Sequence, residues 1–189
     1  MHLAFVLLVA MLSSAGVSSA VSSGGTAASA RQIFDMWPGF WRIKRSVVSP
    51  VKSENMQASG LAAFVPSGEH SNVIRYSEKV VLNEQGGVGT QRYLYKLDAT
   101  SSSISKHFSD GRLFYNMSLA GSRVHADAHL CVADTYMPEY MFIDAATFRL
   151  VYAVTGPAKA YTITTDFVKL SPEEVTQAGL TLTVDGELV

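Results

Sequence analysis

The stretch Met36-Trp37-Pro38-Gly39-Phe40-Trp41-Arg42-Ile43-Lys44-Arg45 decides how the rest of the chain is interpreted. Its Pro-Gly pair is typical of a turn. From Trp41 onward, apolar and basic residues alternate, so that Trp41 and Ile43 share one face of an extended segment and Arg42 and Lys44 share the other. This alternation predicts a strand that begins after a turn and is buried on one face.

Further short strands are predicted at regular intervals along the chain. The expected strands are 41–48, 60–65, 73–82, 90–97, 103–108, 113–117, 147–155 and 160–170, and a last edge strand is expected at 180–184. Asp110-Gly111 indicates a hairpin, because this pair supplies the positive φ angles of a type I′ turn. Short helical turns are expected at 31–37 and, after the N-cap residue Ser171, up to Gly179. Many strands without a long helix between them favour an antiparallel barrel or sandwich.

The composition describes one globular domain of ordinary charge. A net charge of -1 with 16% charged residues gives no basic field, which argues against nucleic acid or an anionic membrane surface as a partner. Cys131 is the only cysteine, so the chain has no internal disulfide and no multi-cysteine zinc site. The expected partner is a small molecule, and no cofactor is predicted.

Residues 1–30 differ from the remainder of the chain. A nearly continuous apolar run from Leu3 to Val17 precedes small residues, and 18–20 and 28–30 both offer a signal-peptidase site. The run is shorter than the roughly 20 apolar residues that a membrane-spanning helix needs, and no later segment approaches that length without charged residues. We expect a leader over 1–30, a barrel domain over 31–170 and a C-terminal extension over 171–189.

A secreted or secretory-lumen location follows from such a leader. An intracellular or organellar location is the alternative, because the leader carries no Lys or Arg. The sequon at Asn116 would matter only in the secretory lumen.

Several ordered motifs carry a resemblance to a known family. They are Gly39-x-Trp41-Arg42-Ile43-x-Arg45, Tyr76-x-Glu78, Arg92-Tyr93-x-Tyr95, Asp110-Gly111-Arg112-x-Phe114, His129-x-Cys131-x-x-Asp134-x-Tyr136 and Gly156-Pro157-x-Lys159-x-Tyr161. The Gly-x-Trp motif resembles the opening of the lipocalin and calycin barrels, in which the Trp plugs one end. The whole set, over about residues 34 to 169, resembles the domain-of-unknown-function family 6314, which is lipocalin-like. Ala160 departs from the family, which tends to have an acidic residue there.

The resemblance implies a fold but no established catalytic residue. It implies an antiparallel calycin-type barrel of about eight to ten strands, a size that can enclose one small ligand. It also implies that Lys169 covers the ring of Trp41, as a basic residue does in lipocalins.

The densest polar group is His129, Cys131, Asp134 and Tyr136. On a regular strand the first two would share one face and the last two the other, whereas a bulge would bring all four together. The group is either a structural hydrogen-bonded network, a ligand-binding cluster or a catalytic one. Cys131 is expected to be a small core residue, because an i, i+2 pair on a strand does not converge as a Cys-His nucleophile requires.

We expect the barrel to bind a small, partly apolar molecule that carries an acidic or carbonyl group. The candidate ligand-binding residues are Arg45, Tyr76, Glu78, Arg92, Tyr93, Tyr95, Arg112, His129, Asp134, Tyr136, Lys159 and Tyr161. Glu78 falls on the apolar face of its strand, so it is either near a strand end or a pocket carboxylate; Lys159 is either a solvated rim residue or an anion contact.

Three alternatives to simple binding remain open. The first is a cofactor-free lyase or isomerase with His129 or Asp134 as general base and Tyr136 as acid. The second is a metal site formed by His125, His129 and Asp127. The third is haem binding through a barrel histidine.

Overall fold

The structure is a computed structural model, and it describes residues 29–49, 55–82, 86–98, 100, 102–119, 121–183, 186 and 188. The proposed leader, apart from its last two residues, lies outside the described residues. The chain begins with α1 (Ala30–Met36) and ends with α2 (Pro172–Gln177). Between these helices, the described residues form β1 (Gly39–Val48), β2 (Asn55–Pro66), β3 (Val73–Leu82), β4 (Val88–Asp98), β5 (Ser103–Phe108), β6 (Leu113–Ser118), β7 (Arg123–His125), β8 (His129–Cys131), β9 (Asp134–Asp144), β10 (Thr147–Gly156) and β11 (Lys159–Lys169).

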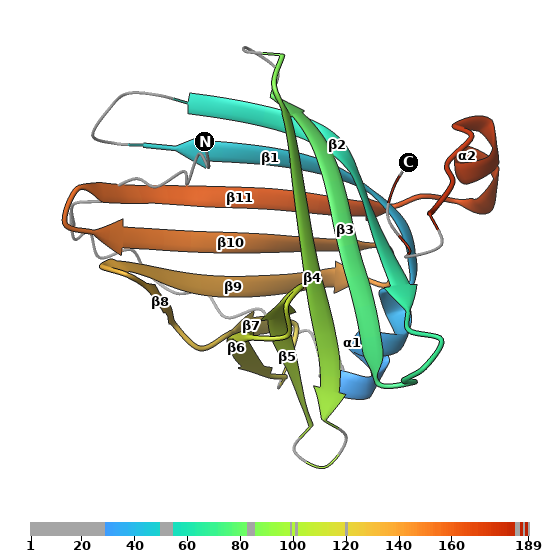
Figure 1. The fold of residues 1–189 in the computed structure, drawn as a ribbon, viewed down its shortest axis with the longest axis horizontal. Coiled ribbons are helices and arrows are strands. Elements are labelled where there is room, and N and C mark those ends of the chain that lie inside the picture. The colour runs from blue at the N-terminus through green and yellow to red at the C-terminus, as the bar shows by residue number, and fades with distance from the viewer. Residues whose placement is uncertain are drawn as a thin grey trace, which may run out of the picture.

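The strands form one curved antiparallel sheet. Its order is β6-β5-β4-β3-β2-β1-β11-β10-β9-β7, with β8 paired to β9, and these eleven strands are those of the described residues (Figure 1). The two ends of this path meet where Met117 bridges Ala126 and the amide of Asp127 donates to the carbonyl of Asn116 at 2.8 Å. The sheet is therefore a nearly closed barrel. This confirms the predicted antiparallel barrel, although the strand count exceeds the expected number because residues 123–144 form three strands.

The alternation of the sequence places the core inside this barrel. On β1 the inward positions are Trp41 and Ile43, both buried, whereas Arg42 and Lys44 are exposed. On β3 the inward residues from Ile74 to Val80 are likewise buried. The strands predicted at 73–82 and 103–108 have the same bounds as β3 and β5. The other strands predicted up to residue 170 differ from the observed ones by a few residues at most, except that β2 begins earlier.

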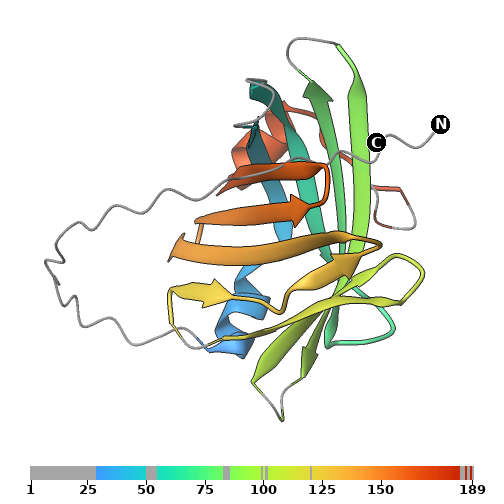
Figure 2. The same cartoon turned by 90° about the vertical axis from the view of Figure 1, so that its left-hand side faces the viewer.

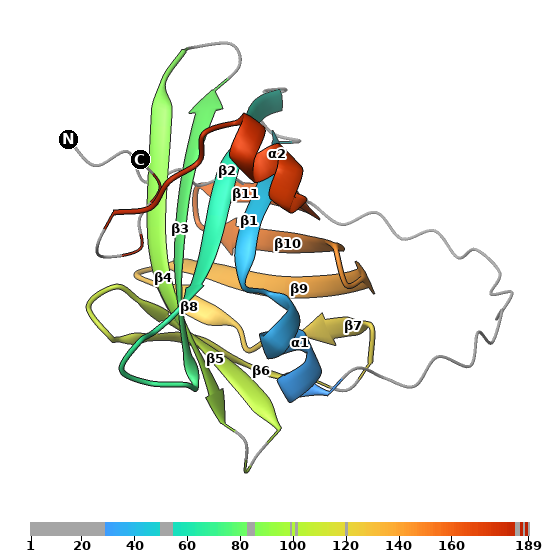
Figure 3. The same cartoon turned by 90° about the vertical axis from the view of Figure 1, so that its right-hand side faces the viewer.

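One end of the barrel is closed by α1 (Figures 2 and 3). Ser29 caps this helix, and its Ile33 and Phe34 are buried in the core. Trp41 is fully buried, and its Nε1 donates to the carbonyl of Trp37 at 2.8 Å. Lys169 Nζ lies 5.5 Å from the centre of the Trp41 ring and donates to the carbonyl of Met36. The placements expected for Trp41 and Lys169 are therefore confirmed.

Three local predictions need correction. The hairpin at 109–112 is present, but among the described residues only Gly111 of its Asp-Gly pair has a positive φ, so the turn is not type I′. Residues 129–136 are not one strand: β8 and β9 form a tight hairpin whose turn contains Val132 at φ 59. At 180–184 the described residues show no strand, only an isolated bridge between Leu182 and Leu188.

The C-terminal helix lies on the outside of the barrel (Figure 3). Its N-cap Ser171 accepts from the amide of Glu174, and Pro172 occupies the first turn, as the sequence predicts. None of its residues is buried. Among the described residues, no helix is long and apolar enough to span a membrane.

Candidate functional site

Along β1, the inward side chains change from apolar at the closed end of the barrel to charged in its middle. Trp41 and Ile43 belong to the closed end, Arg45 follows in the middle, and Val47 lies nearer the other end. On β3 the equivalent sequence is Ile74, Tyr76, Glu78 and Val80. In the register across β2, Glu78 is level with Trp41, and Arg45 lies four residues farther along β1. The Arg45 side chain therefore runs obliquely to reach Glu78.

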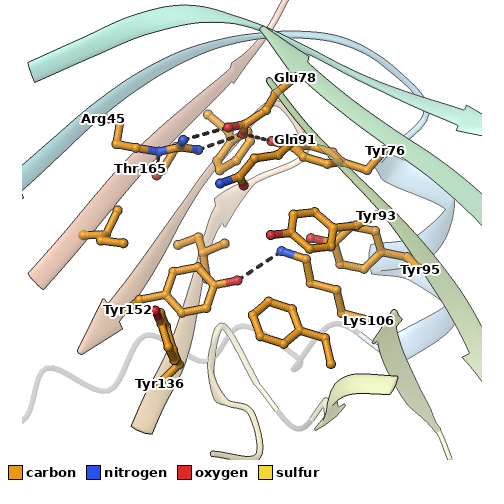
Figure 4. Close-up of a pocket in the computed structure, with 14 residues that line it drawn as sticks. Arg45, Tyr76, Glu78, Gln91, Tyr93, Tyr95, Lys106, Tyr136, Tyr152 and Thr165 are labelled. Carbon is orange, nitrogen blue, oxygen red and sulfur yellow. Dashed lines mark hydrogen bonds and ion pairs between the residues drawn. The ribbon is translucent and has the colours of Figure 1, made fainter. Parts of the chain in front are cut away.

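Arg45 and Glu78 form a bidentate ion pair across β2. The Arg45 Nη1 and Nη2 atoms donate to the two Glu78 carboxylate oxygens at 2.7 Å each, and Nε donates to Thr165 Oγ1 at 2.9 Å (Figure 4). Tyr76 also donates to this carboxylate. The intervening inward positions of β2 are small: Ala58, Gly60 and Ala62. The arginine side chain can therefore reach β3 because β2 offers no large side chain between the two.

The ion pair lies inside the barrel, and both of its side chains remain ionised. Glu78 is only 3% exposed. Burial acts to raise the pKa of its carboxyl, but the hydrogen bonds and charge of Arg45 outweigh burial and hold this pKa below its ordinary value. The interpretation of Glu78 as a cavity carboxylate is supported by this position, since it lies in the middle of a regular strand.

Lys106 on β5 is the second cation in this region, and it is also only 3% exposed. Its Nζ lies 3.8 Å from the centre of the Tyr93 ring and donates to Tyr152 Oη at 3.0 Å. Among the described residues, no carboxylate lies within ion-pair distance of this amine. Burial lowers the pKa of Lys106 to about 7, against the attraction of Glu78.

A chain of tyrosine hydroxyls continues from this lysine. The Oη atoms are 2.8 Å apart between Tyr152 and Tyr115, 2.7 Å between Tyr115 and Tyr140, and 3.3 Å between Tyr140 and Tyr95. Burial raises the pKa of each of these four phenols well above its ordinary value. The hydroxyls therefore remain protonated and act as neutral hydrogen-bond partners at physiological pH.

A bulge between β5 and β6 shapes the wall beside Lys106. Lys106 pairs with Tyr115, but the next pair is His107 with Leu113, so Phe114 is the additional residue. Tyr115 is buried inside the barrel, and Phe114 nevertheless also lines the cavity. The Phe114 ring stacks on Tyr93 with 5.7 Å between ring centres. The bulge thus adds an aromatic wall that regular alternation would have turned outward.

Two spaces inside the barrel share the ion pair as a common border. The inner space has a volume of about 110 Å³ and contains the lysine, the tyrosines and Phe114; it is the cavity drawn in Figure 4. The outer space has a volume of about 390 Å³ and is lined largely by apolar side chains, including Val47, Met56, Val80 and Leu82. Both are bordered by Arg45, Glu78, Gln91 and Ile163. We call them the inner cavity and the vestibule.

Half of the candidate residues lie together at the inner cavity. These are Arg45, Tyr76, Glu78, Tyr93, Tyr95 and Tyr136. The others do not line it. Arg112 is exposed in the turn after β5 and pairs with Asp110, and Arg92 is exposed on the outer face of β4. Lys159 donates to Asp134 at 2.9 Å, and Tyr161 is fully buried.

The polar group at 129–136 is placed on one face by the hairpin, not by a bulge. His129 pairs with Tyr136 and Cys131 pairs with Asp134, so the side chains of the four share a face. The ring of His129 packs edge-on against the ring of Phe114, with 4.4 Å between the ring centres. Asp134 accepts a hydrogen bond from Lys159. Cys131 is exposed, so its prediction as a core residue was wrong. Among the described residues, no group of three His, Cys, Asp or Glu side chains has the geometry to hold a metal ion.

Sequence reasoning missed Lys106 and Tyr152. A signal for Lys106 existed, because it has the same parity as Ile104 and Phe108 on the strand predicted at 103–108. Tyr152 likewise shares the parity of Phe148 and Leu150 on the strand predicted at 147–155. A lysine on the apolar face of a predicted strand, like Glu78 on the strand at 73–82, indicates a charged group inside the barrel.

Comparisons with known proteins agree with the barrel. An S-type phycobiliprotein lyase from Guillardia theta is similar in structure, with 10% sequence identity and a TM-score of 0.61, over 76% of this chain and 94% of that one. A protein with unknown function from the DUF3598 family of Nostoc punctiforme gives 6% identity and a TM-score of 0.55, over 77% and 51%. Such low identities show a shared fold alone. No curated protein matches the sequence. The model of a family of unknown function, DUF6314, matches residues 38–169 and therefore most of the barrel, which shows that the chain belongs to this family.

Proposed function

We propose that this barrel binds one small, partly apolar molecule bearing a carbonyl or carboxylate oxygen. The observation that carries the proposal is that a largely apolar vestibule and a polar inner cavity are neighbours in the barrel, with Arg45 and Glu78 bordering both. Ligand sites commonly combine a mostly apolar lining with a few convergent polar groups. Likeness to the phycobiliprotein lyase supports only the fold on which such a site would be built.

The polar end of the ligand would face Lys106 rather than Arg45. The charge of Arg45 is balanced by Glu78, to which both of its terminal nitrogens donate, and its Nε donates to Thr165. Lys106 has no carboxylate partner among the described residues. The ammonium of Lys106 has three N–H donors, and among the described residues it has one hydrogen-bond acceptor, Tyr152. A ligand oxygen beside Nζ would supply another acceptor. The apolar part of the ligand would then extend past the ion pair into the vestibule.

Isothermal titration calorimetry with decanoate and with 2-decanone tests this proposal. We expect saturable binding of one molecule per chain. Ala58→Trp should weaken it at least tenfold, because Ala58 lines the vestibule and the indole would fill that space. Gln57→Trp is the matched control, since its neighbouring position on β2 is exposed.

The outcomes separate cleanly when both variants keep the wild-type circular dichroism spectrum and melting temperature. Equal binding by all three proteins would place the ligand outside the barrel and contradict the proposal. Absence of binding by the wild type would contradict the proposed ligand class. Native mass spectrometry of the protein as purified adds a check on whether a molecule is already retained.

A further inference from the structure

Lys106 has the setting of a nucleophilic amine. It projects from β5 into the inner cavity, where the face of Tyr93 lies on one side and the hydroxyl of Tyr152 on the other (Figure 4). Among the described residues, the other cation bordering this cavity, Arg45, is neutralised by Glu78, whereas Lys106 has no such carboxylate. The ammonium form of Lys106 therefore lacks a salt-bridge partner that would stabilise its charge.

The neutral form of an amine is the one that attacks a carbonyl carbon. A solvated lysine is almost entirely protonated at pH 7, since its ordinary pKa lies near 10.5. Burial lowers the pKa of Lys106 to about 7, so about half of the chains carry a neutral Nζ at that pH. The corresponding fraction for a solvated lysine is roughly a thousandfold smaller.

We propose that Lys106 captures an apolar aldehyde as an imine on Nζ, with the alkyl or aryl part of the aldehyde in the vestibule. This inference rests on the proposed binding function and assigns the ligand class for that same cavity. The inner cavity, with a volume of about 110 Å³, has room for the carbonyl end, and the larger apolar vestibule receives the remainder. The charged layer formed by Arg45 and Glu78 borders both spaces, so the chain of the ligand passes beside it.

The covalent step balances without an oxidant or a reductant. The lone pair of the neutral Nζ forms a bond to the carbonyl carbon, and a proton shift gives a carbinolamine. The carbonyl oxygen then leaves as water together with the two hydrogens that the amine carried, and a C=N bond remains. The hydroxyl of Tyr152, 3.0 Å from Nζ, is placed to exchange a proton with the amine or the carbinolamine.

Reductive trapping with decanal tests the proposal on the intact chain. The protein is incubated at pH 7 with a small molar excess of decanal in the presence of sodium cyanoborohydride. The adduct is then located by intact-mass and peptide mass spectrometry. We expect one decyl group per chain, located on Lys106, and labelling at this site should exceed that at the exposed Lys79 by two to three orders of magnitude. Lys106→Met should lose the stoichiometric adduct, whereas Lys79→Met should retain it.

The pH profile gives a readout that a purely structural lysine would not produce. The rate of imine formation at Lys106, measured by quenching timed samples with sodium borohydride, should level off above about pH 7 to 8, while the rate at exposed lysines should continue to rise toward pH 10. A profile for Lys106 that matches the exposed lysines would overturn the proposal.

Binding of decan-1-ol, which cannot form an imine, separates the two proposals. If decan-1-ol and decanoate bind but decanal leaves no selective adduct on Lys106, the imine proposal is wrong and the binding function stands. If none of the three molecules binds or reacts in the barrel, both proposals fail. If Lys106→Met is unfolded, Lys106→Arg takes its place, because it retains a cation that cannot form the imine.

Discussion

At the scale of single residues, Lys106 and the Arg45–Glu78 pair differ in how burial affects their charge. Arg45 and Glu78 stay ionised, whereas burial favours the neutral form of Lys106. The arginine and the carboxylate retain their charges because each satisfies the other with two hydrogen bonds of 2.7 Å. Lys106 instead has a tyrosine ring and a neutral hydroxyl beside it. Its charge is only weakly compensated, which is why burial dominates its protonation equilibrium.

This difference predicts how Lys106 affects stability as pH changes. The unfolded chain holds lysine with its ordinary pKa of 10.5, whereas the folded barrel lowers the pKa of Lys106 to about 7. Between these values the unfolded state binds more protons, so the free energy of unfolding rises with pH. The destabilising effect of Lys106 is thus fully present below pH 7 and disappears as pH rises toward 10.5.

Urea unfolding of the wild type and of Lys106→Met between pH 7 and pH 9 checks this sign. The free energy of unfolding of the wild type, relative to the variant, should increase by at most about 1.4 kcal/mol per pH unit. The free energy of unfolding of the wild type relative to Lys79→Met should show no such trend, because the Lys79 side chain is exposed and both proteins retain Lys106. Parallel pH curves for the wild type and Lys106→Met would show that the buried amine has an ordinary pKa.

At the scale of elements, the sequence predicted strands better than it predicted their junctions. Alternation of apolar and polar residues determines the bounds of β3 and β5, because one face of each is buried. The β8–β9 hairpin escaped prediction because its turn uses Val132 at a positive φ, without the Gly or Asn that normally indicates such a turn. The bulge that turns Phe114 inward is similarly invisible, since it arises from the pairing of two strands.

The contact between α1 and β1 gives a prediction about the closed end. Trp41→Ala should lower the free energy of unfolding by about 3 to 5 kcal/mol, because it removes a fully buried ring and leaves a cavity among Phe64, Phe148 and α1. Lys169→Ala should cost much less. Its ammonium covers the ring at 5.5 Å and is only partly buried, so a cation–π contact worth about 0.5 to 2 kcal/mol and one hydrogen bond are lost.

Chemical denaturation followed by circular dichroism measures both changes. Val168→Ala on the same strand is a suitable control, since Val168 is exposed and its truncation should change stability little. Equal losses for Trp41→Ala and Val168→Ala would contradict the plug assigned to Trp41.

At the scale of the whole molecule, the barrel has one end closed by α1 and the Trp41 cluster, with the inner cavity and the vestibule beyond them. Sequence reasoning placed Glu78 on the apolar face of its strand by parity, and it named Arg45 and several tyrosines as candidate ligand-binding residues without settling which of them point inward. It could not identify their partners. Arg45 reaches Glu78 across an intervening strand, and Lys106 on β5 meets Tyr152 on β10, 46 residues later in the chain. Such pairings depend on how the sheet closes, which no local pattern encodes.

The start of the folded barrel bears on the proposed leader. We propose that residues 1–20 are removed in the secretory pathway and that the mature chain begins at Val21, the first of the two cleavage points that the sequence offers. Cleavage after Ala30 would delete Ser29, whose hydroxyl caps α1 in a capping box with Gln32. It would also delete Ala30, which is 2% exposed in the core.

N-terminal sequencing of the protein secreted from its native host, or from a eukaryotic secretory system, tests this choice. We expect Val21 at the mature terminus, because losing the Ser29 cap costs about 1 kcal/mol of stability. The variant Ser29→Ala, produced with the mature terminus at Val21, should show that loss directly in its free energy of unfolding. A terminus at Arg31 would contradict the argument from the cap, and Met1 retained on an intracellular protein would contradict the leader itself.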